Sequence, residues 1–162
     1  MKKIIALLLV VIMLIPSVAL AAQKVDYRTE KLCSMKKEAD RLIGKRYTSA
    51  ELTAAYGMLD GGSNGKLIIG VDNGSLFVSQ VLIKAGILKS PLNGTNLYKI
   101  LNPAKYPQDG SIIFKLSNGK VTRVGILFGG YQYCTTNSRV VKQKFSIRDW
   151  ESIRAFPRLR VK

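Results

Sequence analysis

The sequence predicts a single α+β domain in which N-terminal helices pack on an antiparallel sheet of about five strands. Apolar residues recur at helical spacing within 29–43 and again within 75–85. Beyond residue 110 the pattern changes to the alternation of β-strands, rich in β-branched and aromatic residues. The dipeptide Asn118-Gly119 in this half is a strong signal for a two-residue hairpin turn. A helical half followed by a sheet half is typical of α+β folds.

The first residues have the order of a secretory signal. Two lysines precede an apolar run over 4–15, Pro16 ends the run, and the small residues of a cleavage point follow. The run is shorter than the ~20 residues of a membrane-spanning helix. We therefore expect 1–21 to be a cleaved signal peptide, with an uncleaved membrane anchor as the alternative. Residues 22–162 are then one exported domain of the periplasm, the cell wall or the extracellular space.

The first helix is predicted over 29–43, and Gly44 follows it as a typical C-terminal glycine. The segment "SAELTAAYGML" is compatible with a short helix, whereas "DGGSNGKL" has the composition of a loop. The next helix is expected to start at Ser75, whose hydroxyl can cap it, to bury a stripe that includes Phe77, and to end at Gly86.

A loop is expected over 91–107, and the strands follow it. A short helix at 146–153 and a final strand in "FPRLRVK" complete the prediction. The four strands with clear alternation are predicted at about 111–116, 121–128, 131–135 and 139–145.

The chain is strongly basic, with 26 Lys and Arg against 10 Asp and Glu and a formal net charge of +16. Loss of the signal peptide removes only Lys2 and Lys3 from this excess. Such a charge favours polyanionic partners, which outside the cytoplasm are wall polymers and lipid phosphate groups. Beyond its charge, the sequence has no combination of aromatic and basic motifs typical of nucleic-acid-binding proteins. We therefore expect no specific nucleic-acid binding. Solubility alone is the alternative explanation.

The chain contains no histidine. This removes the usual general base for a Ser or Cys nucleophile and the commonest zinc ligand. Cys33 and Cys134 are too far apart in sequence for a metal cluster of recognisable spacing, so we expect neither metal nor cofactor. In an oxidising compartment the two cysteines permit one disulfide across a loop of about 100 residues. Two free, buried thiols are the alternative.

Four segments in order resemble a known family: "LIGKRY", "DNGSLFVSQVLIKAGI", "PQDGSIIF" and "TRVGILFGGYQYCTT". They are similar to the NlpC-type cysteine peptidases of bacterial cell walls, a papain-like group with related amidases. The pattern of that family reads roughly "LGTPY", "DCSGFVSYVLKKAGI", "PGDLVFF" and "HVGIYLGNGKFIHA". The match covers most of 38–136, and the resemblance implies a papain-like NlpC-type fold for 22–162.

The resemblance places no catalytic chemistry at the family's catalytic positions. Gly74 falls under the nucleophilic Cys, Asn73 under the motif Asp and Ser75 under the motif Ser. A shift of the alignment by one residue supplies no thiol either. Arg123 takes the place of the catalytic His, and Thr135 that of the third polar residue. An arginine stays protonated at any workable pH and cannot act as a base.

The resemblance therefore implies a secreted pseudoenzyme that binds cell-wall peptidoglycan or an anionic envelope polymer, or that regulates a partner hydrolase. We expect its ligand at a helix N-terminus formed by Asn73, Gly74 and Ser75, with Arg123 opposite as an anion-binding group and Tyr133 beside it. A solvated strand position is the alternative for Arg123, and core packing is the alternative for Tyr133. An active peptidase or amidase with a displaced nucleophile is the alternative function. A basic exported polyanion-binding protein is a further one.

Overall fold

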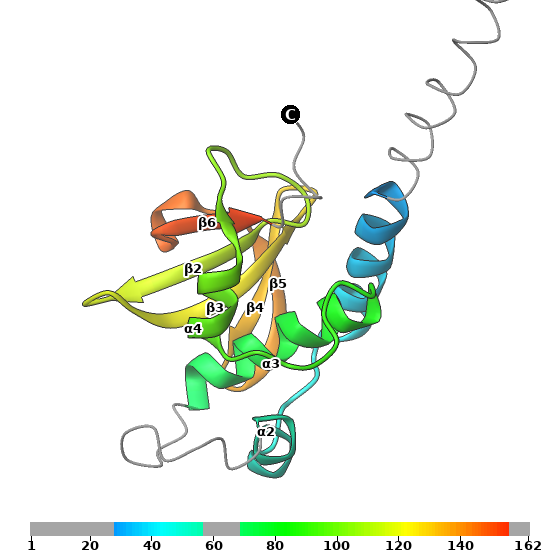
Figure 1. The fold of residues 1–162 in the computed structure, drawn as a ribbon, viewed down its shortest axis with the longest axis vertical. Coiled ribbons are helices and arrows are strands. Elements are labelled where there is room, and N and C mark those ends of the chain that lie inside the picture. Colours follow the sequence, from blue (N-terminus) through cyan, green and yellow to red (C-terminus); the bar gives the residue numbers. More distant parts are fainter. Residues whose placement is uncertain (1–27, 57–68, 156–162) are drawn as a thin grey trace, which may run out of the picture.

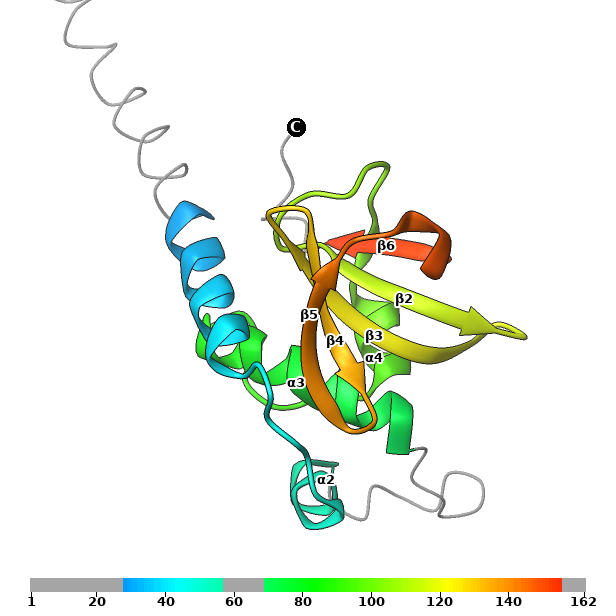
Figure 2. The same ribbon diagram turned by 180° about the vertical axis from the view of Figure 1, so that it is seen from behind.

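A six-stranded antiparallel sheet forms the centre of the protein, as seen in a computed structural model that describes residues 28–56 and 69–155 (Figure 1). The strand order is β1-β6-β2-β3-β4-β5. Helices α3 and α4 cover one face, which we call the inner face (Figure 1). Figure 2 shows the opposite, outer face. The predicted α+β class is confirmed, and the sheet has one strand more than expected.

The strands on the central part of the sheet agree with the sequence prediction. Asn118 and Gly119 have φ values of 50° and 72°, as the tight hairpin turn between β2 and β3 requires. The strands are β1 (Asn102–Pro103), β2 (Ile112–Ser117), β3 (Lys120–Phe128), β4 (Tyr131–Thr136), β5 (Arg139–Lys144) and β6 (Ser152–Ala155).

The helix predicted at 146–153 is wrong. Only a 3-10 turn forms, at Ile147–Asp149, and β6 follows it at once. β6 pairs with β2 on one side and with β1 on the other, so tertiary pairing determines the conformation of this segment. The final strand predicted in "FPRLRVK" lies outside the residues that the structure describes, as do the "DGGSNGKL" loop and the signal segment.

The first helix is described over 28–41, and Gly44 follows it with a φ of +83°, as predicted. The short helix α2 spans Ser49–Tyr56. The long helix α3 spans Ile69–Lys84 and therefore begins more than a turn before its predicted start at Ser75. Asn73 and Gly74 were interpreted as the residues before a helix, but they lie within it.

A helix that the sequence analysis missed, α4 (Gly94–Ile100), lies in the loop expected over 91–107. Asn93 caps it, since its side-chain oxygen accepts a hydrogen bond from the backbone N–H of Asn96 at 2.9 Å. Two turns of helix are too short to give a clear apolar period. None of the helices in the described ranges is long and apolar enough to cross a membrane.

The sheet separates two apolar cores, because successive residues of a strand point to opposite faces. Phe114, Val124 and Ile126 point inward and join the large core under the helices. A smaller core on the outer face consists of Ile113, Leu127, Cys134 and Trp150. The chain reaches this core after β5, when it crosses the outer face on its way to β6 (Figure 2).

Asp40 attaches the 28–41 helix to the sheet. The Tyr133 hydroxyl donates a hydrogen bond to Asp40 Oδ1 at 2.7 Å, and Lys36 Nζ lies 2.8 Å from Oδ2. Lys142 of the edge strand contributes a longer ion pair, with Nζ at 3.5 Å from Oδ1. The hydrogen bonds from Lys36 and from Tyr133 lower the pKa of Asp40.

Tyr133→Phe should therefore destabilise the fold by about 1 kcal/mol, a value at the low end for a bond to a charged group because Asp40 is partly exposed. A carboxylate with a lowered folded-state pKa stabilises the protein above its unfolded pKa, and this stability is lost as the pH falls through the folded value. The difference from wild type should therefore be full at neutral pH and shrink below about pH 4. Urea unfolding measures it, with Tyr131→Phe as the control. Equal losses in both variants would contradict the role of Asp40.

Candidate functional site

Helix α3 packs closely against the sheet at Gly74. A Cβ atom on this residue would lie 2.8 Å from the backbone oxygen of Val124 and 3.3 Å from Thr135 Oγ1. Only glycine permits backbone atoms to pack this closely. Two of the positions taken from the family motif, Gly74 and Thr135, therefore do lie together, but they are in direct contact and leave no room for a nucleophilic side chain between them.

The expected anion site at a helix N-terminus is wrong. Unpaired N–H groups belong to the first turn of a helix, whereas Asn73, Gly74 and Ser75 lie in the second turn of α3. All three residues are also buried, and the side chains of Asn73 and Ser75 are both 0 % exposed. Ser75 consequently does not cap the helix. A ligand in solution cannot reach these residues in this fold.

Arg123 lies on the other face of the sheet. Its Nη2 atom donates to Cys134 Sγ at 3.0 Å and to Thr136 Oγ1 at 3.1 Å, and its guanidinium lies 5.3 Å from the centre of the Trp150 ring. Gly74 lies against Val124, the next residue on β3, whose side chain points inward. Because directions alternate along a strand, Arg123 and Gly74 do not converge on one groove.

Tyr133 is fully buried and donates its hydroxyl proton to Asp40, so it packs in the core instead of lining a ligand site. Of the two alternatives left open for the cysteines, a disulfide or two free thiols, the structure shows free thiols. Cys33 and Cys134 are both free, the former exposed and the latter buried. Burial raises the pKa of the Cys134 thiol, although Arg123 opposes this shift. A buried thiol of raised pKa is a poor nucleophile, so Cys134 gives no support to a displaced catalytic site.

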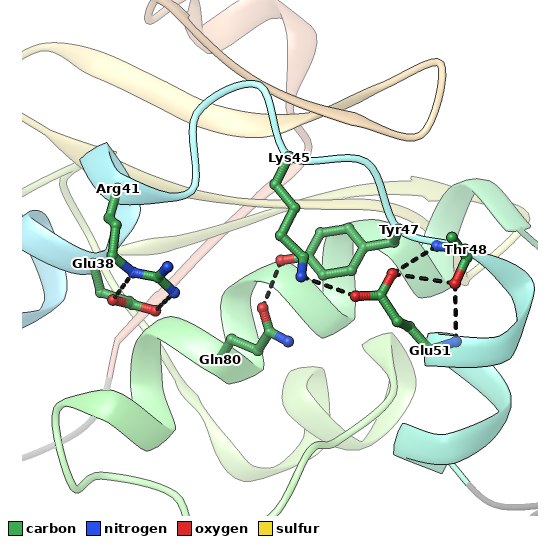
Figure 3. A network of polar contacts seen from close by, with 7 residues as sticks. All are labelled: Glu38, Arg41, Lys45, Tyr47, Thr48, Glu51 and Gln80. Carbon is green, nitrogen blue, oxygen red and sulfur yellow. Dashed lines mark hydrogen bonds and ion pairs between the residues drawn. The ribbon is translucent and has the colours of Figure 1, made fainter.

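Tyr47, the last residue of the "LIGKRY" segment, connects the chain before α2 to α3 (Figure 3). Its hydroxyl donates to Gln80 Oε1 at 2.7 Å. Burial is the main cause that raises the pKa of Tyr47, so the hydroxyl remains a donor at any ordinary pH. No local sequence signal indicates this pair, which fixes the position of the 44–47 segment beside the helix.

The beginning of α2 carries a capping box, also visible in Figure 3. The backbone N–H of Thr48 donates to Glu51 Oε2 at 2.9 Å, and the backbone N–H of Glu51 donates to Thr48 Oγ1 at 3.2 Å. Lys45 Nζ adds an ion pair with Glu51 Oε1 at 2.9 Å. The spacing Thr-x-x-Glu is a sequence signal that predicts this helix start. Lys45, Thr48 and Glu51 therefore form hydrogen bonds and an ion pair with one another, and we interpret this network as structural.

The residues described by the structure contain no group of three side chains that could hold a metal ion. A search of known family profiles finds no family that matches the chain, and a search of curated proteins finds no match either. The resemblance to NlpC-type peptidases therefore rests on the four sequence segments alone.

Gly74→Ala should destabilise the protein by about 1–2 kcal/mol. Alanine in a helix normally gains about 0.5–1 kcal/mol over glycine, but here the added Cβ meets the backbone of Val124, and overpacking costs ~1–3 kcal/mol. Thr53→Ala on the exposed side of α2 is the control and should leave stability unchanged or slightly raised. The measurement is the urea midpoint of each variant. A stabilised Gly74→Ala protein would show that α3 does not pack as described.

Asn73 carries an unpaired amide. Neither its Oδ1 nor its Nδ2 has a hydrogen-bond partner in the described part of the chain, and the side chain is completely buried. Leaving a buried polar group unpaired costs ~1–3 kcal/mol, so this position, aligned with the motif Asp, weakens the fold.

Asn73→Leu should accordingly raise the free energy of unfolding by about 1 kcal/mol, because leucine branches at the same carbon and has no polar atoms to desolvate. Asn96→Leu, at an exposed helical position, should change it little. Calorimetric melting of the two variants distinguishes them. A large loss of stability in Asn73→Leu alone would mean that the amide is paired in solution.

Proposed function

We propose that the chain is an exported, non-catalytic domain on an NlpC-type, papain-like frame, and that it binds anionic material of the cell envelope. The packing at Gly74 is the observation that carries this proposal. The position aligned with the nucleophile has no side chain, and the Val124 carbonyl occupies the space that a nucleophile would need. An enzyme that acts through a thiolate requires a partly accessible sulfur with a neighbouring base.

The arrangement of elements supports the frame. The helix that carries the "DNGSLFVSQVLIKAGI" segment packs directly on the strand that carries "TRVGILF", and the Thr135 position aligned with the third polar residue lies against Gly74. This is the juxtaposition that the resemblance implies for the catalytic positions. Placement of Arg123 on the outer face supports loss of the reaction, because the residue aligned with the base points away from the position aligned with the nucleophile.

The charge supports the choice of partner. Without Lys2 and Lys3, residues 22–162 carry 24 Lys and Arg against 10 Asp and Glu, a net charge of +14. This charge attracts polyanions over distances set by the Debye length, which is about 10 Å at 0.1 M salt. Phosphate-bearing wall polymers and the carboxylates of peptidoglycan stem peptides both carry the required negative charge. Binding through such contacts weakens as salt is added.

The purified protein should therefore sediment with isolated cell walls at low ionic strength and be released by salt, without cleaving them. Long incubation followed by mass spectrometry of the soluble fraction should show no fragments beyond those of a heat-denatured control. New stem-peptide fragments would contradict the non-catalytic proposal. Failure to sediment at low salt would contradict the binding proposal.

A further inference from the structure

The outer face of the sheet carries basic side chains at one level across neighbouring strands. Lys115 of β2 pairs directly with Arg123 of β3. Arg139 of β5 pairs with Thr136 of β4 on one side and with Arg46 of the chain before α2 on the other. The hydrogen bond from Arg123 of β3 to Thr136 of β4 shows that these two residues also lie at the same level of the sheet. We call Lys115, Arg123, Arg139 and Arg46 the basic row.

All four members of the basic row are on the outer face. Each has a chain neighbour that belongs to the inner core, and side chains alternate along an extended strand. Figure 2 looks at this face, where β2, β3, β4 and β5 lie side by side. Lys115, Arg139 and Arg46 are exposed, and Arg123 is half-buried. The neighbours that point inward are Phe114, Val124, Val140 and Tyr47.

Arg46 and Arg139 face each other in the least favourable way for two like charges. Hydrogen bonds from Val140 N to Lys45 O at 2.9 Å and from Tyr47 N to Ser138 O at 3.2 Å bracket the pair. The two arginines are therefore a non-hydrogen-bonded pair, in which opposing side chains come closest. Like charges directly opposite one another on a sheet destabilise it.

Within the described residues, no acidic side chain forms an ion pair with the basic row. Two acids lie near this face. The carboxylate of Glu151 accepts a hydrogen bond from the backbone N–H of Leu116 at 2.9 Å, and Asp149 is close enough to Cys134 to raise the pKa of that thiol. The repulsion in the row is thus not relieved by a direct internal partner, which points to an anion from outside.

Arg123 is held ready for such an anion. Cys134 and Thr136 accept hydrogen bonds from one of its terminal nitrogens, and the guanidinium carbon lies 5.3 Å from the centre of the Trp150 ring. A side chain that is already ordered loses less entropy when it binds a ligand. Arginine presents a planar fork of donors that fits the oxygens of a phosphate group.

We propose that the basic row binds a linear phosphodiester polymer of the polyol-phosphate class, laid across the strands. This inference rests on the proposed function and specifies its ligand. From β2 to the 44–47 segment there are four strand intervals, or about 19 Å at ~4.8 Å each, which suits an extended chain with several phosphates rather than a single anion.

The aromatic residues favour a polymer without bases over a nucleic acid. Single-stranded nucleic acids are bound by stacking bases on exposed aromatic rings. Trp150, the ring beside the row, is 6 % exposed and already carries Arg123. Tyr131 is exposed, but it lies two residues before the inward-pointing Tyr133 on the same strand. It therefore shares the inner face with Tyr133 and points away from the basic row. Neither of these two rings therefore offers a free stacking surface beside the basic row.

The test uses a fluorescent synthetic oligo(glycerol phosphate) and three forms of the protein. These are the wild type, Arg46→Gln/Arg139→Gln, and the charge-matched control Lys89→Gln/Lys99→Gln, whose lysines are exposed in segments outside the sheet. The row variant should bind about tenfold more weakly than wild type. Because it removes two phosphate contacts, it should also lower the slope of log affinity against log salt by about 1.4–2. The control should change affinity by about twofold at most. Because the row variant removes a like-charge pair, its melting temperature should be no lower than that of wild type.

Each other outcome overturns the inference in a distinct way. Equal weakening in both variants would mean that net charge alone binds the polymer. Equally tight, row-dependent binding of oligothymidylate would mean that the ligand class is wrong, and preference for anionic vesicles would assign the face to a membrane. If the wild type sediments with cell walls but ignores the oligomer, the basic row is not the site while the proposed function stands. If it binds neither, both fail.

Discussion

The contact between Gly74 and the backbone of Val124 is the constraint on which the rest of the structure depends. It sets the distance between α3 and the sheet, and it brings the buried side of α3 onto the inner face. The same contact fills the position aligned with a nucleophile. A side chain large enough to react at this position would separate the helix from the strand, so the proposed loss of catalysis would follow from the same packing contact.

The alternation of side chains along the strands divides the strand residues into an inward set and an outward set with different roles. Inward positions such as Val124 and Tyr133 serve the core, whereas outward positions such as Arg123 and Arg139 are available to solvent. A resemblance based on sequence order does not show on which face a residue lies. The Arg123 guanidinium was expected opposite Gly74, and the structure instead places it among the outward basic residues beside Trp150. We therefore propose a ligand site on the outer face instead of at the motif positions.

Local sequence signals predicted the central hairpin of the sheet. The Asn118-Gly119 turn and the strands on either side of it follow from turn geometry and alternation, which are properties of neighbouring residues. The start of α3 at Ile69 could not be predicted from local signals. A glycine that ends or precedes a helix cannot be told, in sequence, from a glycine within a helix that allows a strand to pack closely. β6 and the Arg46–Arg139 pair depend on contacts between distant segments, which no local pattern reports.

Mapping the ligand contacts by NMR tests most directly whether binding has moved away from the motif positions. Oligo(glycerol phosphate) is titrated into isotopically labelled protein, and the backbone amide shifts are followed. We expect saturable shifts at Lys115, Arg123, Thr136 and Arg139, with those of Asn73 and Gly74 unchanged. Shifts centred on Asn73 and Gly74, with the outer strands unaffected, would contradict this expectation.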